Sequence, residues 1–268
     1  MSRPVSQVVS DAPLLLRDDV DGVTTLTLNR PKQYNALSEA MLTALQQALD
    51  AIKADDKVRV VVMAGAGKAF CAGHDLKEMR AHPDKQYQQA LFQRCSRMML
   101  SVTQLPQPVI AKVHGIATAA GCQLVATCDL AVAANEARFA TSGVNLGLFC
   151  TTPGVALGRN VSRKAAMEML LTGEFVSAER AAELGLINRA VPADQLDACV
   201  GELSRNLVGK SPVALRLGKQ AFYRQMEQGL EGAYTDASEV MACNMTTDDA
   251  AEGIDAFIEK RKPNWRGH

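Results

Sequence analysis

Two apolar, β-branched segments, each ending in small residues, constrain the fold of this chain more than any other feature. Residues 58–63 and 109–113 have the composition of strands covered on both faces. The first segment runs into alanine and glycine at 64–67, and the second into the small-residue stretch 115–121. Helical patterns follow both, as expected of crossover units. The sequence therefore predicts an α/β fold of stacked β-turn-α repeats.

Hydrophobic periodicity places the remaining elements. Further strands are predicted at 23–28 and 130–133, and a loop at 69–73. Helices are predicted from Ser38 onward, from 75, over 85–103 and over 122–127. From residue 162 on, the pattern is almost wholly helical, and three hydroxyl residues are predicted helix caps: Ser177, Ser211 and Thr247. The chain thus divides into an α/β part followed by a helical part.

Composition and charge exclude several classes of function. The 268 residues carry 29 Lys+Arg against 29 Asp+Glu, so the chain lacks the basic excess of a nucleic-acid or anionic-membrane binder. No apolar run approaches the roughly 18 residues of a membrane span. Seven cysteines without a CxxC pair predict buried free thiols in a reducing compartment and no metal site. We expect a cytoplasmic protein, or one of the mitochondrial matrix if the source is eukaryotic.

The chemistry is expected where a strand ends in small residues and a helix begins. Unpaired backbone N–H groups and the helix dipole stabilise negative charge at such a place. Residues 69–75 (AFCAGHD) and 115–121 (GIATAAG) are two turns of this kind. Neither matches the GxGxxG dinucleotide fingerprint or the phosphate-binding P-loop. Either turn alone is more often a packing feature than a functional site.

Four motifs in order make the assignment more specific. Residues 29–37 read NRPKQYNAL, 69–79 read AFCAGHDLKEM, 114–129 read HGIATAAGCQLVATCD, and 257–265 read FIEKRKPNW. Together they resemble the enoyl-CoA hydratase/isomerase superfamily, the crotonases, over nearly the whole chain. The resemblance implies a crotonase (ClpP-like) spiral of ββα units over residues 1–205. It also implies a helical trimerisation region over 206–268, in a homotrimer or a dimer of trimers.

The resemblance further implies an acyl-CoA thioester as the ligand, with no cofactor beyond the coenzyme A of the substrate. The oxyanion hole would consist of the backbone N–H groups of His74 and Ala120. A thioester attacked at its β-carbon, or deprotonated at its α-carbon, accumulates negative charge on the carbonyl oxygen, which two fixed donors stabilise. Ala120 stands where the family usually has glycine, and its methyl group narrows the slot.

Further contacts with the substrate are implied by position in the motifs. Lys32 and Lys77 would lie near the phosphates of coenzyme A, and Phe257 and Lys262 would reach the coenzyme A of a neighbouring subunit. The remaining expected substrate-binding residues belong to the same motifs: Ala36, Ala72, Asp75, Leu76 and Gly121. From the residues alone, Asp75 is also a helix cap and both lysines are equally well explained as solvated surface groups.

The sequence departs from a hydratase at both acid/base positions. A hydratase of this family uses two carboxylates to hold a water molecule and transfer its proton. By resemblance these positions are Gln123 and Gly143 here, and neither side chain transfers a proton near neutral pH. Cys150, at the predicted start of a helix, is the one easily ionised group nearby, although a packed thiol is the more common explanation. Weak hydratase turnover is therefore predicted.

Three functions remain open on these residues. The first is an acyl-CoA enzyme, catalogued with the hydratases, that stabilises a thioester enolate. The second is decarboxylation or hydrolysis of a CoA ester, since loss of CO₂ generates the enolate without a strong base. AGHD followed by 144–147 (VNLG) also resembles the methylmalonyl-CoA decarboxylase branch of the family. The third is a protein that binds acyl-CoA without turning it over.

Overall fold

A six-stranded sheet forms the centre of the chain in this computed structural model, which describes residues 12–268. The first two strands form an antiparallel hairpin, and every other pair in the sheet is parallel. The spatial order of the strands is β1 (Leu15–Val20), β2 (Val23–Leu28), β3 (Val60–Gly65), β5 (Val109–Val113), β7 (Leu130–Ala134) and β10 (Arg189–Val191). The parallel arrangement explains why β3 and β5 are apolar on both faces.

A second, smaller sheet is formed by strands that follow those of the first sheet in the chain. Its order is β4 (Ala69–Cys71), β6 (Ile116–Thr118), β8 (Arg138–Ala140) and β9 (Val176–Ser177). Each of β3, β5 and β7 is followed directly by a strand of this sheet and then by a helix. The predicted spiral of ββα units is therefore confirmed.

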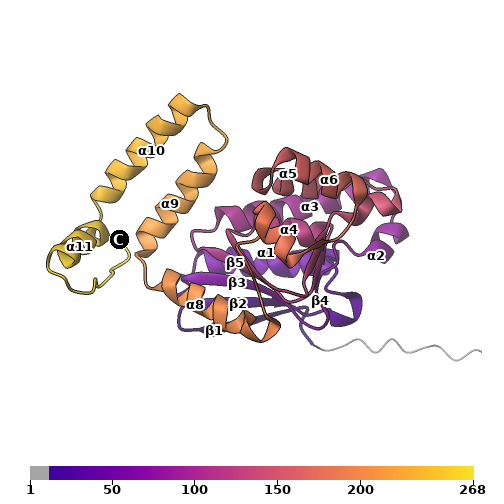
Figure 1. Cartoon of the computed structure of the whole chain (residues 1–268), viewed down its shortest axis with the longest axis horizontal. Helices are drawn as coiled ribbons and strands as arrows, with labels where there is room; N and C mark the ends of the chain where they lie inside the picture. The colour runs from indigo at the N-terminus through magenta and orange to yellow at the C-terminus, as the bar shows by residue number, and fades with distance from the viewer. Residues whose placement is uncertain (1–11) are drawn as a thin grey trace, which may run out of the picture.

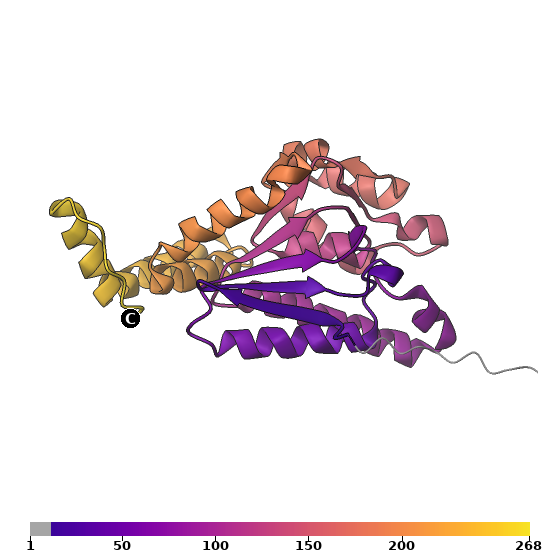
Figure 2. The same ribbon diagram turned by 90° about the horizontal axis from the view of Figure 1, so that it is seen from below.

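Helices cover both faces of the large sheet (Figures 1 and 2). One face carries the main core, in which α1 (Glu39–Lys53), α3 (Lys85–Gln104) and α4 (Ala120–Thr127) bury their apolar residues. The other face packs against α8 (Leu196–Val208) through Leu196 and Val200. The remaining helices of the body are α2 (Leu76–Ala81), α5 (Thr151–Asn160), α6 (Arg163–Thr172), α7 (Ala178–Leu184) and the 3-10 turns η1 (Pro31–Gln33), η2 (Ser142–Leu146) and η3 (Ala193–Gln195).

The C-terminal helices extend away from the body (Figures 1 and 2). They are α9 (Pro212–Gln225), α10 (Leu230–Met245) and α11 (Asp248–Ile258). The ammonium of Lys219, on α9, pairs with Asp129 at 2.7 Å and also donates to the carbonyls of Val102 and Gln107. Tyr223 donates to the same carboxylate at 2.8 Å. This buried cluster holds α9 against the body, whereas α10 buries no residue within the chain.

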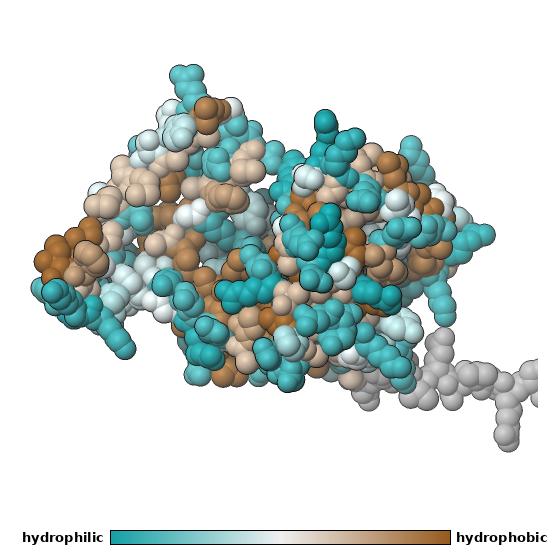
Figure 3. Space-filling view, viewed as in Figure 1, coloured by the Kyte–Doolittle hydropathy of each residue, from teal (hydrophilic) through white to brown (hydrophobic). Residues whose placement is uncertain are grey.

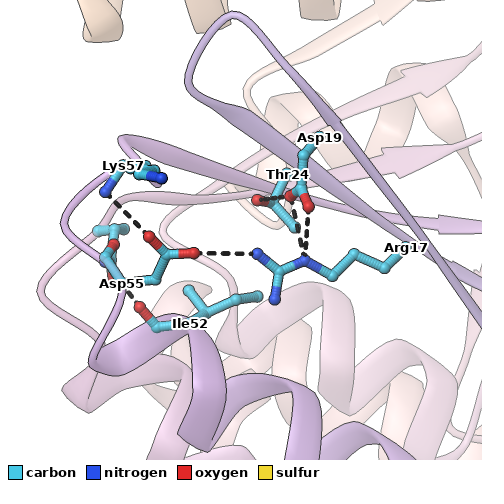
Figure 4. Close-up of polar contacts among 7 residues, drawn as sticks. Arg17, Asp19, Thr24, Ile52, Asp55 and Lys57 are labelled. Carbon is cyan, nitrogen blue, oxygen red and sulfur yellow. Dashed lines mark hydrogen bonds and ion pairs between the residues drawn. The ribbon is translucent and has the colours of Figure 1, made fainter.

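Polar contacts hold the edge hairpin against the end of α1 (Figure 4). Arg17 on β1 pairs with Asp19 at 2.9 Å and with Asp55 at 3.3 Å. Asp55 lies just after α1 and accepts the backbone N–H of Lys57 at 3.0 Å. Thr24 on β2 donates to Asp19. The charged residues of β1 therefore form ion pairs and hydrogen bonds at the edge of the sheet. These contacts explain how a strand with such a polar sequence forms.

Most of the predicted elements are confirmed, and the errors fall on three-residue strands and on the charged strand β1. The strands at 23–28 and 109–113 match β2 and β5, and Ser38, Ser177, Ser211 and Thr247 all cap helices. The loop predicted at 69–73 is wrong because it contains β4, and the turn at 115–121 contains β6. Three residues are too few to show the alternation of a strand. The predicted 205/206 boundary falls inside α8.

The cysteines are free thiols, and five of the seven are buried. Cys199 is half-buried and Cys243 is exposed, so the expectation of burial fails for these two. Within residues 12–268, none of the helices is long and apolar enough to cross a membrane.

Candidate functional site

The fold brings the two small-residue turns into direct contact. A Cβ on Gly73 would lie 2.9 Å from the Cβ of Ala119 and 3.3 Å from the backbone nitrogen of Ala120. The two turns follow β4 and β6, which are parallel neighbours in the small sheet. The positions predicted for the oxyanion hole, His74 and Ala120, therefore lie at one place on the molecule.

The backbone N–H groups of His74 and Ala120 are both available there. Within residues 12–268, neither donates to any backbone or side-chain acceptor. Ala120 is the first residue of α4, where helical N–H groups lack a partner within the helix. The preceding Ala119 has φ +51° and ψ −120°, a backbone conformation that strains an alanine. Its own N–H donates to the carbonyl of Ala140 at 2.9 Å, which fixes the entry into α4.

Gly121 allows close packing between α4 and β4. It is buried, and a Cβ there would lie 2.0 Å from the carbonyl oxygen of Cys71. Only a glycine lets the first turn of α4 approach β4 this closely. The residue predicted to bind substrate thus sets the distance between the two turns.

Two residues of the first motif, to which the sequence assigned no role, brace the site. Asn35 is fully buried, and its amide donates to the carbonyls of Ala66 and Ala69 at 2.8 Å each. It adopts φ +57°, a conformation that asparagine tolerates better than most residues. Arg30 donates to the carbonyl of Ala36 and pairs with Asp75 at 3.0 Å. The signal that could have identified both residues is the motif itself, in which Asn35 lies six positions after Asn29.

The imidazole of His74 is enclosed. It packs edge-on against Phe92 of α3, with ring centroids 5.3 Å apart. Among residues 12–268, neither ring nitrogen has a hydrogen-bond partner. Burial lowers the pKa of His74, so the ring is neutral at pH 7 and adds no positive charge to the site.

Gln123 lies one turn beyond Ala120 on α4. Its side chain is 6% exposed, and its Oε1 has no hydrogen-bond partner among residues 12–268. Buried polar atoms are nearly always paired, so this amide oxygen needs an explanation. An amide at this position orients a ligand or a water molecule, but it does not transfer a proton.

The second acid/base position is closed. A Cβ on Gly143 would lie 2.4 Å from the carbonyl oxygen of Leu148 and 2.7 Å from the sulfur of Cys150. The N–H of Gly143 donates to that sulfur at 3.2 Å. The 148–150 turn therefore fills the space beside Gly143.

Cys150 precedes α5 and has no lowered pKa. Burial raises the pKa of its thiol, and the hydrogen bond from Gly143 only partly opposes that effect. A thiolate activated by the helix N-terminus is therefore not supported, and the packed thiol fits the structure. Thr141 and Ser142 directly precede Gly143 in the chain. The hydroxyl groups of Ser142 and of Thr118 on β6 form a hydrogen bond of 2.7 Å.

The charged residues of the first two motifs surround a surface hollow of about 480 Å³. Asp75 caps α2 by accepting the N–H groups of Lys77 and Glu78. Burial alone would raise the pKa of Asp75, but Arg30 and these N–H groups lower it overall. Lys77 lines the hollow, and Lys32 lies on the neighbouring η1. Within the described chain, neither lysine forms an ion pair.

The other predicted contacts differ in exposure. Ala36 is buried, Ala72 is half-buried and its N–H donates to the carbonyl of Tyr34, and Leu76 is half exposed. Phe257 and Lys262 lie in or after α11, at the end of the molecule opposite α2 (Figure 1). Phe257 is 86% exposed. The chain itself therefore does not bring these two residues to the site.

The arrangement stabilises an anion better than it moves a proton. Two unpartnered N–H groups lie beside Gly73, one of them at the N-terminus of α4, where the helix dipole is positive. The amide of Gln123 is the polar side chain of the next turn, and position 143 has no side chain. Fixed N–H donors of this kind are suited to stabilising negative charge on an oxygen atom.

Comparison with known proteins agrees with this geometry. The family model described as Enoyl-CoA hydratase/isomerase matches residues 18–268. The mitochondrial enoyl-CoA hydratase domain-containing protein 3 of Xenopus laevis is 45% identical over 260 residues, which cover 97% of this chain and 88% of that protein. The likeness to this protein that residues 114–129 and 142–157 suggest is confirmed.

Solved structures give the same result. The crystal structure of an enoyl-CoA hydratase from Mycobacterium smegmatis superposes with a TM-score of 0.93 at 60% identity, covering 95% of this chain and 99% of that one. The crystal structure of human enoyl-CoA hydratase domain-containing protein 3 superposes with a TM-score of 0.92 at 44% identity, covering 94% and 100%.

Proposed function

Because this chain belongs to the enoyl-CoA hydratase/isomerase family, we propose that it binds an acyl-CoA thioester and stabilises its enolate. The observation that carries the proposal is the pair of unpartnered N–H groups at His74 and Ala120, brought together beside Gly73. A fixed donor of this kind lowers a reaction barrier by about 3 kcal/mol. No cofactor is needed, since coenzyme A is part of the ligand.

Lys32 and Lys77 support the binding of coenzyme A. Both are exposed cations on segments that border the hollow of about 480 Å³, and Arg30 there is already paired with Asp75. Charged phosphates are held well by such lysines, even on a chain whose net charge is zero. Alanine at both positions is expected to weaken CoA-ester binding, as measured by calorimetry.

An oligomer would account for the C-terminal helices. Helices α10 and α11 carry exposed apolar side chains, among them Leu230, Tyr234, Met241, Phe257 and Ile258, and a hydrophobic patch lies at the α11 end of the molecule (Figure 3). Helix α10 buries no residue within the chain, and such a helix is not stable alone in water. We therefore infer that a second copy of the chain packs against it. We propose a homotrimer or a dimer of trimers, which light scattering tests.

We do not expect this site to hydrate enoyl-CoA esters efficiently. Gln123 does not transfer a proton near neutral pH, and the site at Gly143 is filled by the 148–150 turn. Hydration of crotonyl-CoA is expected to be far slower than in a relative with two glutamates at these positions. Rapid hydration by the purified protein would contradict this interpretation of the site.

A second candidate is supported by the same combination of features. Decarboxylation of a malonyl-type CoA ester needs anion stabilisation and no strong base, because CO₂ carries away the carboxylate carbon and leaves the electron pair as the enolate. Hydrolysis would instead release free coenzyme A, and binding without turnover would leave every ester intact. Incubation with enoyl-, malonyl-type and saturated CoA esters, followed by mass spectrometry, separates these outcomes.

One variant tests the site itself. In Ala120→Pro the N–H at the first position of α4 is replaced by a ring carbon that occupies the hole, and circular dichroism checks that the variant is folded. Whatever CoA-ester turnover the panel reveals should fall about 100- to 1000-fold. Arg163→Pro, at the exposed first position of α6, is the matched control and should retain activity. Equal turnover in Ala120→Pro and the unaltered protein would exclude this hole.

A further inference from the structure

The two turns of the site touch at two places, and the two contacts differ in kind. At Gly121 the lack of a side chain lets α4 approach β4, because a Cβ there would lie 2.0 Å from a backbone oxygen of that strand. At Ala119 a methyl group faces Gly73 instead, and a Cβ on Gly73 would lie 2.9 Å from the Cβ of Ala119. His74 directly follows Gly73, and Ala120 lies between the two contacts on its own turn.

The space between Gly73 and Ala119 holds one methyl group. The Cβ of Ala119 lies in contact with the Cα of Gly73. A second methyl group, on Gly73, would also lie 3.2 Å from the carbonyl oxygen of Thr118 and 3.3 Å from the backbone nitrogen of Ala120, closer than ordinary contact. The Cβ of Ala119 therefore fills this space and determines how closely the turns approach at this point.

The methyl group is held there against the preference of the backbone. Ala119 has φ +51° and ψ −120°, close to the values of the first central residue of a type II′ turn, where glycine predominates. A residue with a Cβ is strained in this conformation and keeps it only where its surroundings enforce it. Glycine would form the same turn without strain, so the presence of an alanine needs a reason.

Neighbouring elements enforce the conformation on both sides of Ala119. Its N–H donates to the carbonyl of Ala140 on β8 at 2.9 Å, and its carbonyl accepts the N–H of Gln123 on α4 at 3.0 Å. Thr118, the residue before it, is held to Ser142 by the hydroxyl hydrogen bond of 2.7 Å. The peptide that carries the next N–H, the donor at position 120, is thereby fixed through its own carbonyl group.

We propose that Ala119 is a positioning residue of the oxyanion hole, in which its methyl group is a spacer between the turns that carry the His74 and Ala120 donors. The spacer keeps the turns apart so that both N–H groups reach one carbonyl oxygen. Ala119 acts through these donors and makes no hydrogen bond to the ligand itself. This inference rests on the proposed stabilisation of a thioester oxygen and adds the residue that sets the geometry of the hole.

Ala119→Gly tests the spacer because the substitution has opposite expected effects on stability and on the hole. It removes the strain, so the midpoint of urea unfolding should rise. Binding is measured by calorimetry on the full chain with two probes. One is an analogue of butyryl-CoA in which a methylene group replaces the sulfur, so that the carbonyl is kept and is not hydrolysed. The other is butyl-CoA, a thioether without a carbonyl.

The readout is the preference for the carbonyl group. The unaltered protein should bind the carbonyl probe about tenfold more tightly than butyl-CoA, as expected of two net hydrogen bonds to one oxygen atom. In Ala119→Gly one of these bonds is lost, so the preference should fall to about threefold while the affinity for butyl-CoA stays the same. A residue that only supports the fold would change both affinities together or neither.

Two further variants separate the methyl group from the strain. Ala119→Ser keeps the Cβ and should keep the preference. Asp21→Gly is the matched control, since Asp21 has a positive φ of 48° in the turn between β1 and β2. This turn lies at the end of β2 and β3 opposite Gly65, from which the chain continues to the site. Asp21→Gly should therefore raise the unfolding midpoint and leave both affinities unchanged.

The outcomes are distinct. A carbonyl preference that survives in full in Ala119→Gly, one that falls equally in Ala119→Ser or Asp21→Gly, or a lower unfolding midpoint in Ala119→Gly would overturn the spacer. Each of these results would leave the proposed acyl-CoA function intact. If the unaltered protein binds neither probe, or binds both equally, the oxyanion hole itself is excluded and both proposals are overturned.

Discussion

The close contact between Gly121 and β4 predicts that Gly121→Ala lowers both the stability of the chain and its turnover. In Gly121→Ala the new methyl group would lie 2.0 Å from the carbonyl oxygen and 2.9 Å from the Cβ of Cys71. Ordinary contact needs a separation of roughly 3.5 Å, so α4 and β4 must move apart by more than about 1 Å. Both partners are backbone segments of the core, which have no free rotamer to absorb the movement.

The expected cost follows from overpacking. Extra atoms in a well-packed core typically destabilise by about 1–3 kcal/mol, and contact with backbone places Gly121→Ala at the upper end, near 3 kcal/mol. Urea unfolding followed by circular dichroism, at one fixed protein concentration, measures this loss. The same movement separates Ala120 from His74, so turnover should also fall, by about 100-fold for a displacement of 1 Å.

Gly218→Ala is the matched control and has the opposite expected sign. Gly218 is an exposed residue inside α9, and a Cβ there meets no atom within 4 Å. Alanine is a better helix former than glycine by about 1 kcal/mol, so Gly218→Ala should stabilise the chain. If Gly121→Ala unfolds within about 0.5 kcal/mol of the unaltered protein, or if both variants shift in the same direction, the account of α4 packing is refuted.

Three further predictions concern stability, each measured by urea unfolding. Lys219→Met leaves Asp129 buried without its cation and should lower the free energy of unfolding by about 3 kcal/mol. Lys112→Met removes an exposed ion pair and should lower it by under about 1 kcal/mol. Equal losses in the two variants would contradict a stabilising role for the Lys219–Asp129 pair. Ala119→Gly relieves a positive φ and should stabilise by about 1 kcal/mol, and a loss would show that the strain is absent. The pKa of Asp75 is lowered on folding, so its contribution is complete above pH about 4 and disappears as the pH falls through the folded pKa. The difference in unfolding free energy between the unaltered protein and Asp75→Asn should therefore shrink in acid, and a constant difference would argue against that shift.

The sequence predicted the parts of this fold that depend on periodicity and on local chemistry. The long helices and their caps at Ser38 and Thr247 follow from repeated apolar positions and hydroxyl side chains. Strands of three residues, such as β4 and β6, depend on neighbours that come from distant parts of the chain, and no local pattern marks them. The charged strand β1 was missed because its stability comes from pairing with β2 and from contacts with the end of α1.

The site was predictable as far as the backbone defines it. The family resemblance assigned the two N–H donors to His74 and Ala120, and the fold places these residues together. The environment of the side chains was not predictable, because it depends on three-dimensional neighbours. The enclosed ring of His74 rests on Phe92 of α3, and the filled space at Gly143 comes from a turn five to seven residues later.

The contact between Gly143 and the 148–150 turn has a consequence for the history of this chain. A mutation that introduced a glutamate at 143 would meet the Leu148 carbonyl at 2.4 Å, so its bearer would lose stability before gaining any activity. The thiol of Cys150 would have to be replaced, and the turn reshaped, beforehand. A site with two carboxylates is therefore not reachable from this chain by a single substitution at position 143.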